Sequence, residues 1–239
     1  MTLRPSSTSQ PNPSAPQAGS WALEGILPHG VLPRIAGPPS AGRQPPRGEL
    51  GRHGLRVAAY AFVTARAYGL TDSECVRVRV AAALHDVGKT LVPTYLLQKR
   101  GPLSPSERRR VEAHTVKGDT LLMVSDEPKL RAAAQVALSH HENFDGSGYP
   151  HGLAGKGIPL GGRITRVADV FDALTIQRPY RSPRSEHEVL AFLEMRAGTL
   201  FDPEVVAALL RALVEYPGLN ARLRRLTGEQ EQTTLPEQR

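Results

Sequence analysis

A short stretch at residues 81–89 constrains this chain more than any other. Three alanines and a leucine are followed by His85 and Asp86, and then by valine, glycine and Lys89. An imidazole and a carboxylate on neighbouring residues at a helix end can point toward two metal ions, with the aspartate bridging both. A His-Asp pair alone is more often an ordinary polar pair, so the metal interpretation depends on partners elsewhere in the chain.

The composition predicts a globular protein and narrows its location and partners. The chain has 239 residues, enough for a buried core, and a formal charge of +7. It has no array of alternating basic and aromatic residues, so we expect no polymeric nucleic acid partner. Cys75 is the only cysteine, and no apolar run approaches the roughly 20 residues of a membrane helix. We therefore expect a cytoplasmic location and no membrane insertion.

Residues 1–47 differ from the rest of the chain. They hold ten of the 21 prolines, with many Ser, Gln and Gly residues and no sustained periodicity. This composition predicts a disordered Pro-rich leader. The role of its more apolar part, residues 21–35, stays open. We expect the folded domain at 48–215 and a short helix with a polar tail at 216–239.

From Glu49 onward the apolar residues recur at helical spacing, and strand-like alternation is absent. Capping-box patterns at Thr71 and Ser104 predict two helix starts. The first of these helices is expected to continue to Gly88, which places the His-Asp pair in its last turn. Other helices are expected near 130–142, 163–176, 185–197, 203–214 and 219–226. The sequence therefore predicts an all-α fold.

One connection is too long for a simple link between packed helices. It runs from Asn143 to Gly162 and is rich in glycine and proline. Long ordered loops in compact domains usually carry function. We expect this loop to form part of the site.

Possible metal ligands recur at the ends of the expected helices. The set is Glu49, His53, His85, Asp86, His114, His140, His141 and Asp169. Each residue alone is more often structural, but together they are difficult to explain as structure. Nitrogen and oxygen donors without cysteine favour iron or manganese over a closed structural zinc site. The set exceeds the needs of one ion, so we expect two or three divalent ions sharing a hydroxide, an arrangement that hydrolyses phosphoesters.

These residues, in this order, resemble the HD-GYP phosphodiesterases, with similarity from about Glu49 to Leu213. Five motifs carry the resemblance: residues 84–89, residues 140–150 with Asp-Gly-Ser-Gly-Tyr-Pro, residues 167–174, Arg-Pro-Tyr-Arg at 178–181, and residues 198–203. The resemblance implies an HD-superfamily helical domain. It also implies hydrolysis of cyclic di-GMP to the linear dinucleotide, to GMP, or to both.

The resemblance also implies roles for individual residues. The histidines and aspartates of the set become metal ligands with Asp86 bridging, and Glu49 matches the acid found in members that hold a third ion. Lys89 is expected to act with Asp86 in catalysis, beside the scissile phosphate or the hydroxide. Substrate-binding residues are then Tyr149, Arg178 and Arg181.

Two other functions stay open at this stage. One is a catalytically weak HD-GYP module that signals through protein contacts, for example with diguanylate cyclases. The other is an HD hydrolase of another nucleotide. The metal's identity, the end product, the activating signal and the oligomeric state are not determined by the sequence.

Overall fold

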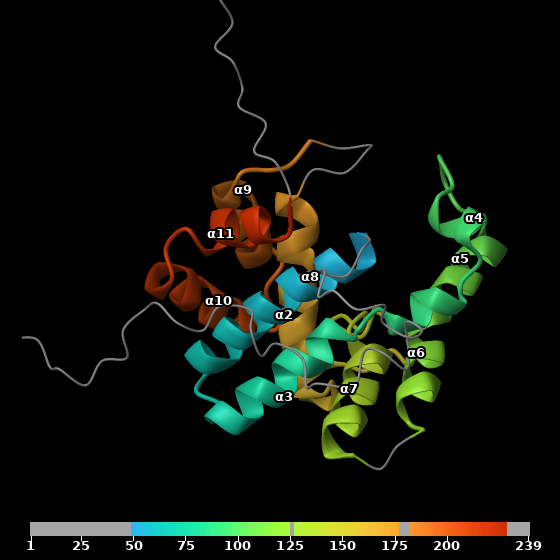
Figure 1. Cartoon of the computed structure of the whole chain (residues 1–239), viewed down its shortest axis with the longest axis horizontal. Helices are drawn as coiled ribbons and strands as arrows, with labels where there is room; N and C mark the ends of the chain where they lie inside the picture. The colour runs from blue at the N-terminus through green and yellow to red at the C-terminus, as the bar shows by residue number, and fades with distance from the viewer. Residues whose placement is uncertain (1–48, 125–126, 177–181, 229–239) are drawn as a thin grey trace, which may run out of the picture. The chain divides into compact units, whose positions relative to one another are not determined.

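Helices form the regular secondary structure of the described residues, which are 49–124, 127–176 and 182–228 of a computed structural model (Figure 1). Within these ranges only two isolated β-bridges occur. The elements are α2 (Glu49–Tyr68), α3 (Asp72–Ala83), η1 (Val87–Leu91), α4 (Thr94–Leu97), α5 (Pro105–Glu112), α6 (His114–Leu122), α7 (Pro128–Ser139), η2 (Gly155–Gly157), α8 (Leu160–Thr175), α9 (Glu186–Met195), α10 (Pro203–Glu215) and α11 (Leu219–Leu226). The all-α prediction is confirmed. The expected leader at 1–47 lies outside the described residues.

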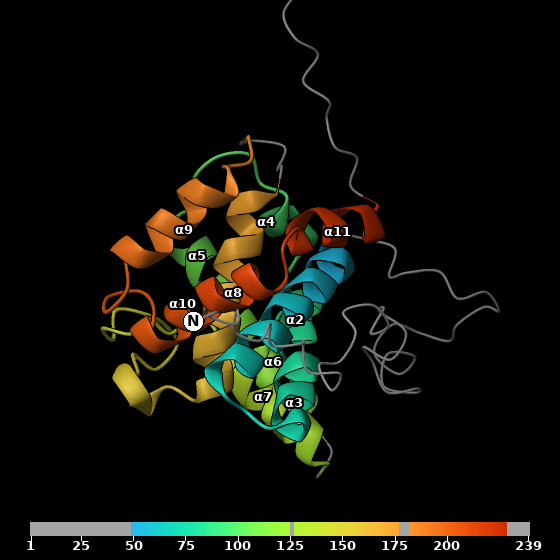
Figure 2. The same ribbon diagram turned by 90° about the vertical axis from the view of Figure 1, so that its left-hand side faces the viewer.

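Helix α2 lies at the centre of the fold and contacts α3, α8 and α10. In both views α3, α6 and α7 lie below α2, and α9 lies above it (Figures 1 and 2). One buried cluster joins α2 to α8, α9, α10 and α11, and it includes Tyr60, Phe171 and Leu209. A second cluster joins α3, α6 and α7 through residues such as Val80 and Leu122. The helices that carry or precede the expected ligands contribute residues to one or both of these clusters.

The helix before the His-Asp pair ends earlier than expected. The helix that starts at Asp72 stops at Ala83, so His85 and Asp86 lie in the turn before η1 and not in the last helical turn. The His85 ring accounts for this, because its Nδ1 lies 2.7 Å from the Ala82 carbonyl and takes that acceptor. The segment after Ser104 forms two helices, because α5 ends at Glu112 and α6 begins at His114.

The expected helix starts are confirmed. The side chains of Thr71 and Ser104 each accept from the backbone N–H three residues later, and Glu74 and Glu107 complete both capping boxes. Helix α8 begins at Leu160, three residues before the expected start, so the preceding loop is shorter than predicted. Among the described residues, no helix is both long and apolar enough to cross a membrane.

Helix α11 lies beyond the expected domain end at residue 215, yet it packs into the core. Leu219 and Leu223 belong to the first buried cluster. Asn220 accepts a hydrogen bond from the hydroxyl of Tyr60 on α2, at 2.9 Å. We therefore propose that the folded domain continues through α11.

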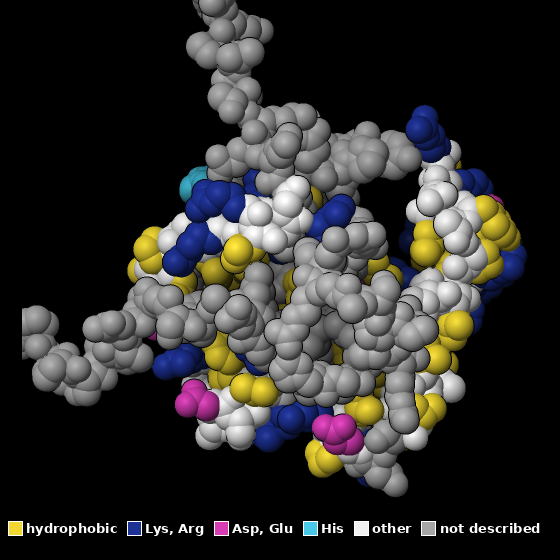
Figure 3. All heavy atoms as spheres, viewed as in Figure 1, with side chains coloured by type: hydrophobic (Ala, Val, Ile, Leu, Met, Phe, Trp, Pro, Cys, Tyr) yellow, Lys and Arg dark blue, Asp and Glu magenta, His cyan; other side chains and the backbone are white. Residues whose placement is uncertain are grey.

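Most of the α4–α5 segment is exposed. No residue of α5 is buried, and Leu91, Tyr95 and Leu97 are exposed near it. Figure 3 shows hydrophobic and basic side chains side by side over this segment, at the right-hand edge. Helix capping, rather than core packing, stabilises α5.

Gly88 allows η1 to lie directly against α6, and this contact provides the first prediction. A Cβ at Gly88 would lie 1.9 Å from the His114 carbonyl oxygen and 2.6 Å from the Gly118 nitrogen. We expect Gly88→Ala to lower the free energy of unfolding by about 2–3 kcal/mol, since backbone would have to move. The control is Gly157→Ala, where a Cβ has nothing within 4 Å. Equal denaturant midpoints for the two variants would contradict this packing.

Candidate metal centre

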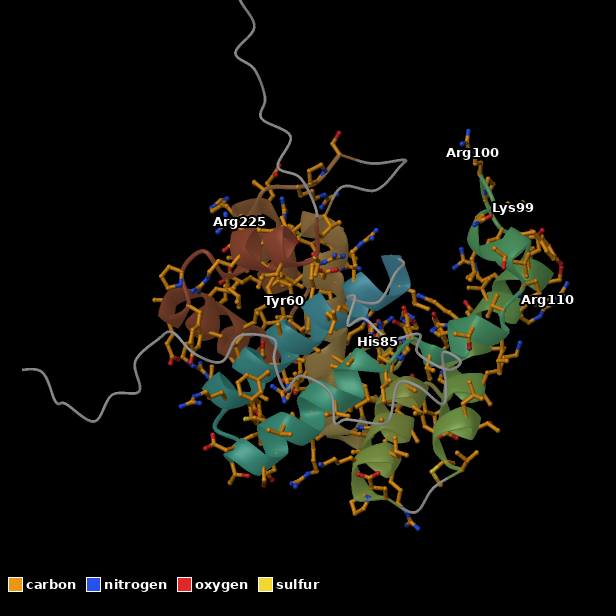
Figure 4. All side chains as sticks on the ribbon, viewed as in Figure 1. Tyr60, His85, Lys99, Arg100, Arg110 and Arg225 are labelled. Atoms are coloured by element: carbon orange, nitrogen blue, oxygen red, sulfur yellow. The ribbon has the colours of Figure 1, made fainter. Side chains whose placement is uncertain are left out.

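The expected ligands converge from five parts of the fold. His53 comes from α2, Asp169 from α8 and His114 from the start of α6, while the adjacent pairs 85–86 and 140–141 follow α3 and α7. Figure 4 labels His85 at the end of α3, near the centre of the domain. His85, His114 and His140 are almost completely buried. Seven of the eight expected ligands therefore meet in one place.

The seven residues form two groups. Asp86, His114, His140 and His141 make the first, which we call group 1, and His53, His85 and Asp169 make the second, group 2. In each group one candidate ligand atom per residue lies within 4.8 Å of the others. Two neighbouring groups of this size fit two metal positions better than one.

The carboxylate of Asp86 faces both groups. Its Oδ1 lies 3.3 Å from Nε2 of His114 and 3.6 Å from Nε2 of His140, both in group 1. Its Oδ2 lies 3.3 Å from Nε2 of His85, in group 2. One oxygen for each group is the arrangement that a bridging carboxylate requires.

Three histidines are held in the same way by the helix ends that carry them. Nδ1 of His85 lies 2.7 Å from the carbonyl of Ala82, and Nδ1 of His114 lies 2.8 Å from that of Val111. Nδ1 of His140 lies 2.9 Å from the carbonyl three residues earlier. A carbonyl can only accept, so Nδ1 carries the proton in each ring. In the neutral imidazole, Nε2 then presents a bare lone pair to the site.

These lone pairs lie close to one another and to a carboxylate. Nε2 of His114 and Nε2 of His140 are 3.3 Å apart, and each is near Oδ1 of Asp86. Within the described part of the chain, Nε2 of His85 is buried without a hydrogen-bond partner. Acceptors facing acceptors in a buried site are costly unless a cation lies between them. The donor set therefore fits a divalent metal ion.

His53 is oriented by a buried carboxylate. Its Nδ1 lies 2.7 Å from Oδ2 of Asp172, and its Nε2 lies 3.1 Å from Oδ1 of Asp169. Nε of Arg56 donates to Oδ1 of Asp172 at 2.7 Å, and Nη2 donates to Oδ2 at 3.1 Å. Arg56 and Asp172 are completely buried. Asp172 thus holds the ring of His53 while Arg56 compensates the carboxylate charge.

The electrostatics of the site keep its carboxylates ionised. Burial opposes ionisation of Asp86, but the neighbouring His85 ring and the positive charge of Lys89 hold its pKa well below the usual range. Burial also opposes ionisation of Asp169, and the hydrogen bond from His53 lowers its pKa well below the usual range. Both carboxylates are therefore available as anionic ligands at neutral pH.

His140 and His141 of group 1 stay neutral, whereas His53 in group 2 is protonated on both ring nitrogens. Burial lowers the pKa of His140 to about 4 and takes that of His141 well below its usual range. Burial also disfavours the charged form of His53, but its hydrogen bonds to Asp169 and Asp172 raise its pKa to about 10. A metal ion bound in group 2 would have to displace that proton.

Lys89 and Tyr149 lie at the same site. Nζ of Lys89 is 2.6 Å from Oδ2 of Asp86, so the lysine charge is directed at the bridging position. The ring of Tyr149 stacks on that of His141, with 4.8 Å between centroids. Three expected site residues are not placed. Arg178 and Arg181 lie outside the described residues, and so does the side chain of Glu49.

Sequence reasoning missed several residues that shape the site. Asp172 and Arg56 are each three residues from an expected ligand, Asp169 and His53, so helical spacing was the signal for both. Glu142 is buried, and its carboxylate accepts the backbone N–H groups of residues 151 and 153, which fixes the loop before α8. No sequence pattern predicted that role of Glu142.

Comparison with known families agrees with this geometry. Residues 43–205 match the family described as HD domain. The chain belongs to the HD domain family. The resemblance to HD-GYP proteins drawn from the sequence motifs is confirmed by relatives named as cyclic di-GMP phosphodiesterases.

Curated relatives of this HD domain include proteins from three bacteria. The 3'3'-cGAMP-specific phosphodiesterase 2 of Vibrio cholerae is 39% identical over 175 residues, which are 73% of this chain and 34% of the relative. The cyclic di-GMP phosphodiesterase of Thermotoga maritima is 40% identical over 163 residues, 68% of this chain and 44% of the relative. The response regulator RpfG of Xanthomonas campestris, also named a cyclic di-GMP phosphodiesterase, is 44% identical over 156 residues, 65% and 41% of the two chains. The chain thus spans less than half the length of these relatives.

Solved structures show the same fold. Bd1817 of Bdellovibrio bacteriovorus superposes with a TM-score of 0.56 at 21% identity, covering 69% of this chain and 52% of that protein. A cyclic GMP-AMP-specific phosphodiesterase of Vibrio cholerae gives a TM-score of 0.55 at 22% identity, covering 73% and 47%. At this level of identity the likeness concerns the HD fold alone.

The orientation of His53 by Asp172 provides a prediction. Asp172→Asn keeps the shape but weakens the hold on Nδ1 of His53, so we expect metal affinity at group 2 to fall about 10- to 100-fold. Equilibrium dialysis with metal analysis measures this. Thr227→Val is the matched control, since it removes the 3.3 Å bond from Arg56 to Thr227 but leaves Asp172 intact. Unchanged metal affinity in Asp172→Asn, with the fold retained, would contradict the assigned orientation.

Proposed function

We propose that this chain is a metal-dependent phosphodiesterase that hydrolyses cyclic dinucleotides, with cyclic di-GMP as its first substrate. One observation carries the proposal: buried acceptor atoms of two groups converge on the two oxygens of Asp86. The names of the curated relatives, which include both cyclic di-GMP and 3'3'-cGAMP phosphodiesterases, support the substrate class.

The proposed metal ligands are the seven residues of groups 1 and 2, with Asp86 shared. Divalent ions bound there supply an activated water at neutral pH and neutralise phosphoryl oxygens. Mixed imidazole and carboxylate donors suit iron or manganese, and we propose two such ions. Glu49 is the proposed ligand of a third.

The chain's own side chains have further roles in this proposal. Lys89, which lies against Asp86, provides a positive charge where the phosphorane oxygens become more negative. Tyr149 offers an aromatic face beside His141, against which a base or sugar can pack. Arg178 and Arg181 are proposed to bind phosphates or guanines, since guanidinium groups both pair with phosphate and stack on bases. A lone, buried Cys75 is consistent with the cytoplasmic location that we propose.

Turnover of a substrate panel tests the proposal. Metal-loaded protein should convert cyclic di-GMP to the linear dinucleotide or GMP, and 3'3'-cGAMP and mononucleotides should be compared at equal concentration. A preference for mononucleotides would favour the alternative nucleotide hydrolase. No turnover with iron or manganese under reducing conditions would contradict the enzyme proposal and favour a module acting through contacts with proteins such as diguanylate cyclases.

Two variants test whether the activity depends on Asp86 and Lys89. Asp86→Asn should lower kcat at least about 100-fold and also reduce bound metal, because it weakens the shared ligand. Lys89→Met should lower kcat about 100- to 1,000-fold with metal content unchanged, because only the charge is lost. The control is Lys156→Met, a change at an exposed lysine that pairs with Glu204. Full activity in Lys89→Met would remove the lysine from the mechanism.

A further inference from the structure

Arg166 is a cation beside the metal centre that has no acidic partner among the described residues. It lies on α8, three residues before Asp169, so the two side chains leave the same face of the helix. The side chain is partly buried, and its Nε is fully buried without a hydrogen-bond partner among the described residues. Among the described residues its one hydrogen bond runs from Nη2 to Oδ1 of Asn143, at 2.9 Å, and that oxygen carries no net charge.

Two other arginines of this region differ from Arg166. Arg56 pairs with Asp172, and Arg163, also on α8, pairs with Asp202. No carboxylate among the described residues lies within ion-pair distance of Arg166. Desolvating a guanidinium without a counter-charge is costly. The absence of such a partner, on a helix where a neighbouring arginine has one, indicates that the counter-charge comes from a ligand.

Arg166 also lies within electrostatic reach of both metal groups. Burial lowers the pKa of His141 in group 1, and the nearby positive charge of Arg166 lowers it further. Burial lowers the pKa of Arg166 itself, while the charge of Asp169 in group 2 opposes that change. Metal ions at groups 1 and 2 would add more positive charge to these surroundings. An anion that contacts both metal positions can compensate the charges of the metal ions and of Arg166.

We propose that Arg166 binds a phosphate group of the substrate through the guanidinium N–H groups that do not bond to Asn143. A planar guanidinium can donate two parallel hydrogen bonds to phosphate oxygens, and such charge-assisted bonds are strong. Asn143 fixes one end of the group, and the buried ring of Phe201 lies 5.9 Å from the guanidinium carbon. Arg166 is thus positioned before the ligand arrives. The inference rests on the proposed phosphodiesterase function and extends it to a residue that its motifs did not include.

A structural role for Arg166 is the alternative. Asn143 begins the loop that leads to Tyr149, so Arg166 would then serve only to hold this loop. The matched control is Asn143→Ala, which removes the bond to Arg166 but keeps the positive charge. If the charge binds phosphate, Arg166→Gln should weaken substrate binding much more than Asn143→Ala does.

Steady-state kinetics and phosphate binding test the inference on the metal-loaded protein. Arg166→Gln should raise KM for cyclic di-GMP about 10- to 100-fold, the usual effect of losing a charged hydrogen bond, with bound metal and Tm unchanged. Arg166→Lys should recover part of the loss, since it restores the charge without the fork. An unchanged KM in Arg166→Gln, or an equal defect in Asn143→Ala, would overturn the inference.

Inorganic phosphate separates this inference from the proposed function. Isothermal titration of metal-loaded wild-type protein with phosphate should show binding that Arg166→Gln weakens at least about 10-fold. If wild-type protein binds phosphate through Arg166 but hydrolyses no cyclic dinucleotide, the proposed substrate is wrong and the phosphate site stands. Equal phosphate affinity in wild-type protein and Arg166→Gln would overturn the phosphate site whatever the substrate.

Discussion

The site depends on one repeated interaction, a histidine Nδ1–H that donates to the carbonyl three residues before it. His85, His114 and His140 all do this at the C-terminal ends of α3, α5 and α7. The last carbonyls of a helix have no partner within it, so the ring satisfies one of them and the helix stops there. The same bond fixes the tautomer and turns Nε2 toward Asp86. The same hydrogen bond therefore ends the helix and orients the histidine as a ligand.

A second constraint joins the site to the rest of the core. Asp172 lies between His53 and Arg56, and Arg56 also donates to Thr227, just after α11. These groups are buried, so removing one leaves another polar group without its partner. The stability of the α2–α8–α11 packing and the orientation of a proposed metal ligand are thus coupled. Arg56 and Arg163 pair with carboxylates, whereas Arg166 has no carboxylate within ion-pair distance in the described part of the chain.

Much of this arrangement could be predicted from sequence, because helix signals are local. The capping boxes at Thr71 and Ser104 placed two helix starts correctly, and the ordered histidines indicated the metal centre. The helix end at Ala83 was predicted five residues too late. Apolar periodicity continues through residue 87, and only the three-dimensional contact of the His85 ring with a carbonyl shows why the helix stops. The partners of Asp172 and Arg166 could not be predicted, since they come from residues distant in sequence.

The central claim is that Asp86 joins two metal positions, and anomalous X-ray diffraction from crystals of the manganese-loaded protein tests it most directly. We predict two strong peaks, one within group 1 and one within group 2, each within about 2.0–2.3 Å of a different oxygen of Asp86. A single peak held by only one group, or two peaks of which only one contacts Asp86, would contradict the bridging arrangement.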